Sequence, residues 1–245
     1  MVVRRAIESS AGRAATVPNL TAAQIKKLLA FRGYGNPNGR FWFVGMEEGG
    51  TSDVTSLQIR ADNFGSLADL AESHSHFPTH DMSKLTTSTW GLMSSIVGRI
   101  SEDSDWWSTE YRRNYQSRRL GRLNGDTYLT EILPLPKKAF NDWPYGELFE
   151  SPNAYRKTVL PNRLKQLSSD YSNASPKPEF VFCYGKSFWP EHRDGFDFIN
   201  FQPALNGAIE LGRNEQSVFI LTKFFDYGRM GFSKDFVDEL CTLIT

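Results

Sequence analysis

The chain has 245 residues, equal numbers of basic and acidic side chains, and a mean hydropathy of -0.44. This size and composition are typical of one globular domain with a sizeable core, and the chain has no apolar run long enough to cross a membrane. The zero net charge argues against binding nucleic acid through overall positive charge, although a local basic face would suffice. We therefore expect a single cytoplasmic domain over residues 1–245, with no obligate protein partner.

The beginning of the chain and its two cysteines fit this expectation. The first 18 residues start with a pair of arginines but contain no apolar stretch after them, which predicts a flexible arm rather than a secretory signal. Cys183 lies in the apolar run FVFCY, and neither it nor Cys241 has a partner at metal-ligand spacing. Buried thiols fit this pattern better than a disulfide framework does.

The first half of the chain predicts two helices and one strand. Thr21 precedes an amphipathic run that predicts a helix ending near Gly33. RFWFVGM, which begins at residue 40, is a continuous apolar run typical of a buried parallel strand, and we expect MEEGG to end it. Residues 51–85 show little periodicity and are expected to be mostly loop with short helices. Residues 88–100 predict an amphipathic helix.

The second half of the chain predicts further strands that alternate with helices. We expect residues 105–123 to be helical in part, and YLTEI to form a strand that the two prolines of LPLPKK stop. The remaining predicted elements are a helix over 154–167 with Pro161 at its start or at a kink, strands over 179–184 and 217–222, and a capped helix over 233–243.

Strands that alternate with helices predict an α/β fold, here a three-layer αβα sandwich around a central, mainly four-stranded parallel sheet. Ligands bind such sheets beyond the carboxyl ends of the strands. Each of the four predicted strands ends in polar residues or glycine, which we expect to converge on one cleft. These residues are Gly45, Met46, Glu47, Glu48, Gly49 and Gly50, then Thr130 and Glu131, then Gly185 and Lys186, then Thr222 and Lys223.

A nucleotide-cofactor site is not indicated. The glycine-rich segment VGMEEGG lacks both the GxxxxGK[ST] and the GxGxxG patterns, and its carboxylates would repel a phosphate. We expect no cofactor.

The four strand ends, in this order, resemble motifs of the uracil-DNA glycosylase superfamily. FWFVGMEEGG is similar to the first motif, in which an apolar strand runs into GQDPYH, GEAPG or GINPG. TYLTEILPLPK resembles the second strand, which runs into Thr-Asn and a proline-containing loop, and FVFCYGKSF resembles the third, which ends in glycine. SVFILTKFF takes the place of the last motif, usually apolar residues and then His-Pro-Ser. The resemblance covers residues 39 to 230 and implies the same scaffold and a DNA partner.

The departures from these motifs imply altered chemistry. Glu47 stands where the superfamily has Asp, Asn or Ala, and Glu48 replaces a proline. Glu131 replaces the asparagine that reads the base, and Lys223 replaces the histidine. The resemblance therefore implies a divergent member.

Cleavage of an N-glycosidic bond develops positive charge on the sugar and negative charge on the leaving base. Glu47 is the candidate that stabilises the sugar cation or takes a proton from the attacking water. Lys223 is the candidate that stabilises the leaving base, and it could instead form a Schiff base with the sugar. We favour hydrolysis, with Gly45, Met46, Glu48, Gly49, Gly185 and Lys186 contacting the substrate.

Glu131 bears on which base is bound. An ionised glutamate only accepts hydrogen bonds, so it would pair with the amino group of a cytosine-like base, whereas a protonated Glu131 would reverse this argument. We therefore expect a monofunctional DNA glycosylase for a modified cytosine, a role that would suit defence against viruses with modified DNA. The alternatives are another nucleoside or nucleotide hydrolase on the same scaffold and a non-catalytic nucleic-acid-binding relative.

A base that leaves the duplex needs an aromatic platform, for which the resemblance favours Phe64 over Phe77 and Trp90. His74, His76 and His80 have the spacing of a metal cluster, but no further ligand completes it, so we expect no metal. His192 is expected in a surface turn. The arginines of 112–122 predict a solvated helix face, and Trp106 and Trp107 predict core packing, with base stacking as the alternative.

Overall fold

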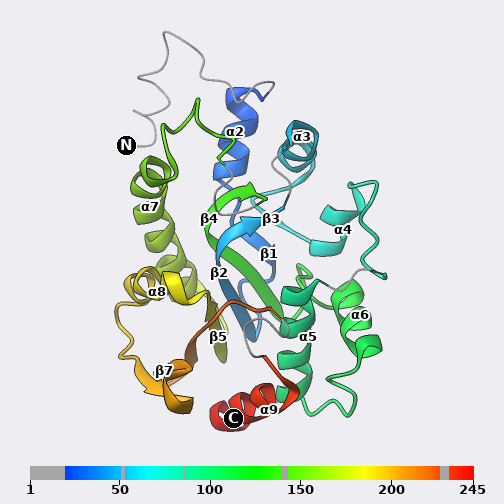
Figure 1. Ribbon diagram of the computed structural model, residues 1–245, viewed down its shortest axis with the longest axis vertical. Coiled ribbons are helices and arrows are strands. Elements are labelled where there is room, and N and C mark those ends of the chain that lie inside the picture. Colours follow the sequence, from blue (N-terminus) through cyan, green and yellow to red (C-terminus); the bar gives the residue numbers. More distant parts are fainter. Residues whose placement is uncertain (1–19, 51–52, 85–86, 139–142, 227–231) are drawn as a thin grey trace.

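The structure is a computed structural model that describes residues 20–50, 53–84, 87–138, 143–226 and 232–245. The predicted flexible arm over residues 1–18 lies outside this range. Figure 1 shows a central sheet with helices packed on both of its faces, which confirms the predicted α/β fold. None of the helices in the described residues is long and apolar enough to cross a membrane.

The described chain forms one eight-stranded sheet in the order β3-β1-β4-β2-β5-β8-β7-β6. Its four central strands, β4-β2-β5-β8, are parallel, as predicted. β1 pairs antiparallel with β4, and β7 and β6 extend the other edge antiparallel. The strands are β1 (Gly33–Gly35), β2 (Phe41–Gly49), β3 (Leu67–Ala68), β4 (Thr127–Lys137), β5 (Phe180–Tyr184), β6 (Gln202–Ala204), β7 (Ile209–Arg213) and β8 (Val218–Thr222).

Helices cover the two faces of the sheet in two groups. One face packs against α2 (Ala22–Leu29), α3 (Val54–Asn63), α7 (Pro152–Asn173) and α8 (Trp189–Gly195). The other packs against α4 (Leu70–Ser75), α5 (Ser88–Ile100), α6 (Thr109–Arg118) and α9 (Lys234–Ile244). Short 3-10 helices span Lys186–Phe188 and Leu205–Gly207.

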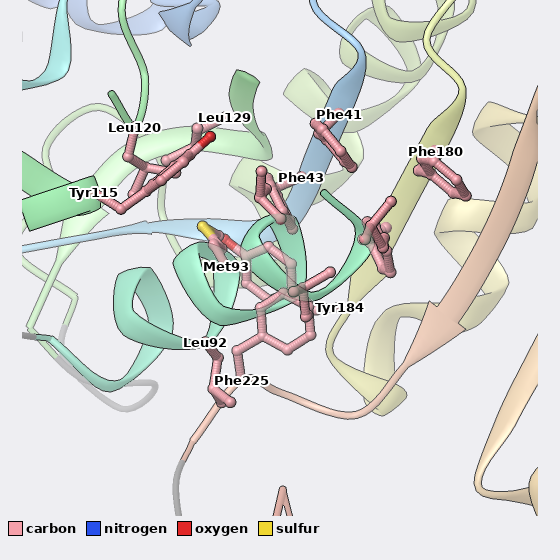
Figure 2. Packing of buried hydrophobic residues seen from close by; sticks show 14 of the residues in the cluster. Phe41, Phe43, Leu92, Met93, Tyr115, Leu120, Leu129, Phe180, Tyr184 and Phe225 are labelled. Carbon is pink, nitrogen blue, oxygen red and sulfur yellow. The ribbon is translucent and has the colours of Figure 1, made fainter. Parts of the chain in front are cut away.

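The strands are apolar on both sides because both faces are covered. On the α5 side, Phe43 of β2 stacks on Phe182 of β5 with ring centroids 5.3 Å apart. Further along the same face, Tyr184 stacks on Phe225 at 4.8 Å (Figure 2). This aromatic layer extends to Tyr184 at the carboxyl end of β5, which lines a cavity.

Two strands run further than the sequence indicates. β2 continues through the segment MEEGG to Gly49, and β4 continues through Pro134 and Pro136 to Lys137, so the expectation that the prolines stop β4 is wrong. β1 pairs with β4 only near its start, at Tyr128 and Leu129. Beyond that point no strand among the described residues pairs with this edge of β4, and a proline there removes no ladder hydrogen bond.

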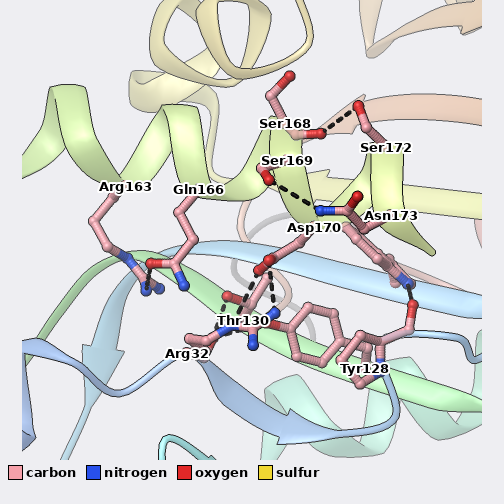
Figure 3. A network of polar contacts seen from close by, with 12 residues as sticks. Arg32, Tyr128, Thr130, Arg163, Gln166, Ser168, Ser169, Asp170, Ser172 and Asn173 are labelled. Carbon is pink, nitrogen blue, oxygen red and sulfur yellow. Dashed lines mark hydrogen bonds and ion pairs between the residues drawn. The ribbon is translucent and has the colours of Figure 1, made fainter.

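The long helix α7 is tied to β4 through a polar network (Figure 3). Asp170 of α7 pairs with Arg32 at 2.6 Å. The backbone carbonyl of Arg32 accepts hydrogen bonds from the hydroxyls of Tyr128 and Thr130. From the same helix, Arg163 donates to the backbone carbonyl of Glu131 at 2.6 Å. These bonds fix the position of the strand that carries Glu131.

The expectation for His192 is also wrong. This residue lies in α8 and is completely buried, rather than in a surface turn. The polar composition of the motif PEHRDG is typical of a turn. However, α8 packs against α7 and β5, and this packing encloses the imidazole of His192. Burial lowers the pKa of His192 to about 4.

Candidate functional site

A cavity of about 290 Å³ lies beside the carboxyl ends of β2 and β5 and the first half of β4, on the α5 side of the sheet. Polar and aromatic side chains from distant parts of the chain form its wall. Its lining residues are Tyr34, Glu47, Glu48, Gly49, Gly50, Arg60, His74, His80, Thr87, Thr89, Trp90, Met93, Leu129, Glu131, Tyr184 and Phe224.

The pairing of β2 with β4 is irregular beside this cavity. The register shifts between Glu47 and Gly49, from Glu47↔Leu133 to Gly49↔Lys137, so the extra residues lie in β4. In a regular strand, neighbouring side chains point to opposite faces. At this irregularity the neighbours Glu47 and Glu48 both line the cavity.

Glu47 is held by an ion pair. Its Oε2 lies 2.9 Å from Nζ of Lys137, at the far end of β4. Both side chains are largely enclosed, with 15% of Glu47 and 6% of Lys137 exposed. A buried carboxylate needs such a partner. The pair therefore presents a carboxylate of fixed position to the cavity.

Glu48 belongs to a second buried pair. Its Oε1 accepts from Nη1 of Arg60 at 2.7 Å and from the hydroxyl of Tyr34 at 3.0 Å. The guanidinium of Arg60 also lies over the rings of Phe64 and Phe77. Burial and Glu48 raise the pKa of Tyr34, so its phenol stays protonated.

Glu131 lies across the strand from Gly45, its register partner on β2. The Glu131 carboxyl extends over Gly45, and its Oε1 accepts from the hydroxyl of Tyr184 on β5 at 2.7 Å. Its Oε2 is enclosed and has no hydrogen-bond partner among the described residues. Burial and the nearby Glu48 raise the pKa of Glu131 well above its ordinary value. We infer that this carboxyl is neutral in the folded protein.

Two histidines complete the wall on the α4 side. Nδ1 of His74 lies 2.8 Å from Nδ1 of His80, and the two rings are nearly parallel, at 12°. His74 is buried against Trp90, whereas His80 is exposed at the rim. Burial and the positive charge of Arg60 lower the pKa of both histidines, that of His74 to about 3. Both imidazoles are therefore neutral near pH 7.

These states leave the cavity with little net charge. Glu47 and Glu48 are each matched by a cation, while Glu131 and the histidine pair are neutral. A cavity with so little net charge favours a neutral group over a free phosphate. Trp90, Met93, Leu129 and Phe224 add apolar and aromatic surface.

The structure gathers some of the sequence-predicted residues and separates others. Glu47, Glu48, Gly49 and Glu131 line the cavity, and Gly45 lies beneath the Glu131 carboxyl. Met46 instead contacts Ser187 and lies against Gly185, where a Cβ would come within 2.2 Å of its sulfur. Lys186 lies over the ring of Trp189. None of Met46, Gly185 and Lys186 is among the lining residues.

The two remaining predicted residues also lie outside the lining. Nζ of Lys223 lies 5.6 Å and 5.1 Å from the ring centroids of Phe232 and Phe236, and its neighbour Phe224 takes the cavity position. Phe64 packs under Arg60 rather than on the cavity, and Trp90 provides the aromatic wall. The predicted glutamates thus converge on one cavity, with Glu131 inside β4 rather than at its end, whereas the predicted lysines do not.

Sequence reasoning did not identify Tyr34, Arg60 and Tyr184 as site residues. Tyr34 lies on a three-residue strand and Arg60 on a helix within a segment predicted to be mostly loop, so neither has a motif around it. Tyr184 ends the predicted third strand, but it reaches Glu131 across β2, where Gly45 has no side chain to separate them.

The fold and cavity together define an α/β protein whose site lies beside the carboxyl ends of β2 and β5 and is lined by polar and aromatic side chains. No protein-family model matches the chain, and no curated protein matches it. Within the described ranges, no group of three or more histidines, cysteines or carboxylates is placed to hold a metal ion.

Proposed function

We propose that this protein is a DNA glycosylase that hydrolyses the N-glycosidic bond of a flipped-out modified base. The observation that carries the proposal is that the Glu47 carboxylate, paired with Lys137, and the carboxyl of Glu131 line one cavity. About 290 Å³ lies at the lower end of the range for small-molecule sites. That volume suits one base with part of its sugar, and the base must leave the duplex to enter it.

Glu47 is assigned to the sugar side of the bond. Its carboxylate can stabilise the developing oxocarbenium ion or accept a proton from the attacking water. The ion pair with Lys137 holds the carboxylate in place, which supports a role that depends on position. Lys223 as a catalytic residue stays a prediction from the sequence, and its contacts with Phe232 and Phe236 give it no part in the present proposal.

Glu131 is assigned to the base. A neutral carboxyl both donates and accepts hydrogen bonds. It can therefore pair with the N3 and amino group of a cytosine derivative, and equally with the N3–H and carbonyl of a uracil-like base. The preference for a cytosine derivative no longer follows from Glu131 alone and remains part of the proposal, as does a role in defence against modified viral DNA.

The test is incubation of the purified protein with duplex and single-stranded DNAs that each carry one modified cytosine or uracil derivative. The freed base is identified by mass spectrometry, and the abasic site is detected by alkaline cleavage. The proposal expects at least one base to be released and the remaining DNA strand to stay intact before alkali. DNA binding with no base released from any substrate would favour the non-catalytic alternative. Release from free nucleosides alone would favour a nucleoside hydrolase.

A borohydride experiment separates the two chemistries considered for the sugar. A Schiff base between a lysine and the sugar would be trapped as a covalent protein–DNA adduct, whereas hydrolysis leaves none. We expect no adduct during base release.

A further inference from the structure

The proposed reaction leaves negative charge on the departing base, and the cavity needs a hydrogen-bond donor to stabilise it. Several hydroxyls and cations that line the cavity already donate within the protein, and these donors are directed away from a ligand. They are Tyr34 and Arg60 to Glu48, Tyr184 to Glu131, and Thr89 to the carbonyl of Phe225. The histidine pair differs from them because one of its two rings is exposed at the rim.

The contact between the two imidazoles constrains their protons. An Nδ1···Nδ1 distance of 2.8 Å requires one nitrogen to donate and the other to accept. If His74 donates, then His80 must carry its own proton on Nε2. If His80 donates instead, then the buried Nε2 of His74 must carry a proton.

The surroundings of His74 favour the first arrangement. Nε2 of His74 is enclosed and has no hydrogen-bond partner in the described part of the chain. A buried N–H without a hydrogen-bond partner is rarer than a buried acceptor without one. An unprotonated Nε2 is therefore favoured in His74. His74 therefore donates through Nδ1, and His80 is left with an N–H at Nε2.

We propose that His80, fixed in this tautomer by His74, donates a hydrogen bond through Nε2 to the leaving base. His80 would touch the substrate and is thus a catalytic residue, whereas His74 is a positioning residue. As the C–N bond breaks, its electron pair passes to the base. The water oxygen bonds to the sugar carbon, and the water proton goes to Glu47. The inference rests on the proposed glycosylase function.

The test uses variants that separate the two edges of the imidazole. An asparagine at position 80 can keep the contact with His74 but has no donor at the place of Nε2, whereas glutamine reaches that place with its amide. H80N should lower single-turnover base release by about 100-fold, the effect of removing one transition-state donor. H80Q should recover most of this loss. H76N is the matched control, because His76 is an exposed histidine of the same segment outside the cavity lining.

A second readout excludes a merely structural role. The substrates are oligonucleotides with uracil, 5-fluorouracil, cytosine or 5-fluorocytosine, compared within a pair that the wild type cleaves. Fluorine stabilises the base anion, so the donor matters less, and H80N should lose under 10-fold on the fluorinated base. Equal losses on both bases, or full activity of H80N, would overturn the assignment of His80. A wild type that releases no base from these or the modified substrates would instead overturn the glycosylase proposal itself.

Discussion

The carboxyl of Glu131 occupies the space that a side chain on Gly45 would need. A Cβ at Gly45 would lie 1.9 Å from Oε2 of Glu131, far inside van der Waals contact. Gly45→Ala should therefore displace the carboxyl and lower the free energy of unfolding by about 1–3 kcal/mol. Gly49→Ala is the control, since its Cβ would meet nothing within 4 Å. Urea unfolding of both variants measures the difference, and equal stabilities would show that Glu131 is not confined as described.

The Glu48–Arg60 pair should be among the most sensitive positions of the site. Arg60→Met leaves Glu48 buried without its cation, and breaking such a pair costs about 3–5 kcal/mol of unfolding free energy. The exposed pair Arg40–Glu179 provides the comparison, where Arg40→Met should cost at most about 1 kcal/mol. Chemical denaturation checks both values, and similar losses for the two variants would contradict the assigned burial.

Glu131 should make folding less favourable as the pH rises. Its pKa is raised in the folded state above the ordinary value of 4.5, so the folded protein retains a proton that the unfolded chain has lost. Stability must then fall with rising pH above about pH 4.5, by up to about 1.4 kcal/mol per pH unit. Glu131→Gln removes this titration and should gain stability relative to wild type between about pH 5 and about pH 8. A constant difference over that range would show that Glu131 is ionised.

Burial of His74 should make stability rise with pH in the acid range, which is opposite to the effect of Glu131. Its pKa is lowered to about 3 from 6.5, so the unfolded chain binds a proton that the folded protein does not. Stability is therefore lost as the pH falls from 6.5 toward 3. His74→Asn, which does not titrate there, should show a weaker decline in melting temperature with acid than wild type does. Parallel declines would mean that His74 is accessible to protons.

Much of the sheet follows from local sequence, because buried parallel strands are continuous apolar runs. The four central strands and the helix over Ser88–Ile100 lie where periodicity indicates them. The edge strands do not: β6 and β7 have few apolar residues, and they form through pairing with β8 rather than through a pattern of their own. Pro134 shows the reverse case, where a residue that normally stops strands is tolerated at an edge with which no described strand pairs.

Only the site residues on the predicted strands could be predicted from the sequence. Glu47 and Glu131 line the same cavity because β2 and β4 are neighbouring strands. Arg60 reaches the same cavity from α3, and His80 reaches it from the segment after α4. No sequence motif links either residue to the strands that carry the glutamates. Lys223 directly follows the last residue of β8, but its long side chain extends to Phe232 and Phe236, a contact set by α9 packing. Long-range packing, rather than spacing, decides these positions.

The proposed action of Glu47 on the sugar of a base bound in this cavity is tested most directly by single-turnover base release by Glu47→Gln, measured beside the affinity of this variant for the same DNA. Glutamine keeps the shape but can neither take the water proton nor offset the sugar cation. We expect release to fall by about 10²–10⁴-fold while the dissociation constant for DNA changes only a few-fold. Base release at the wild-type rate by this variant would show that Glu47 has no such role.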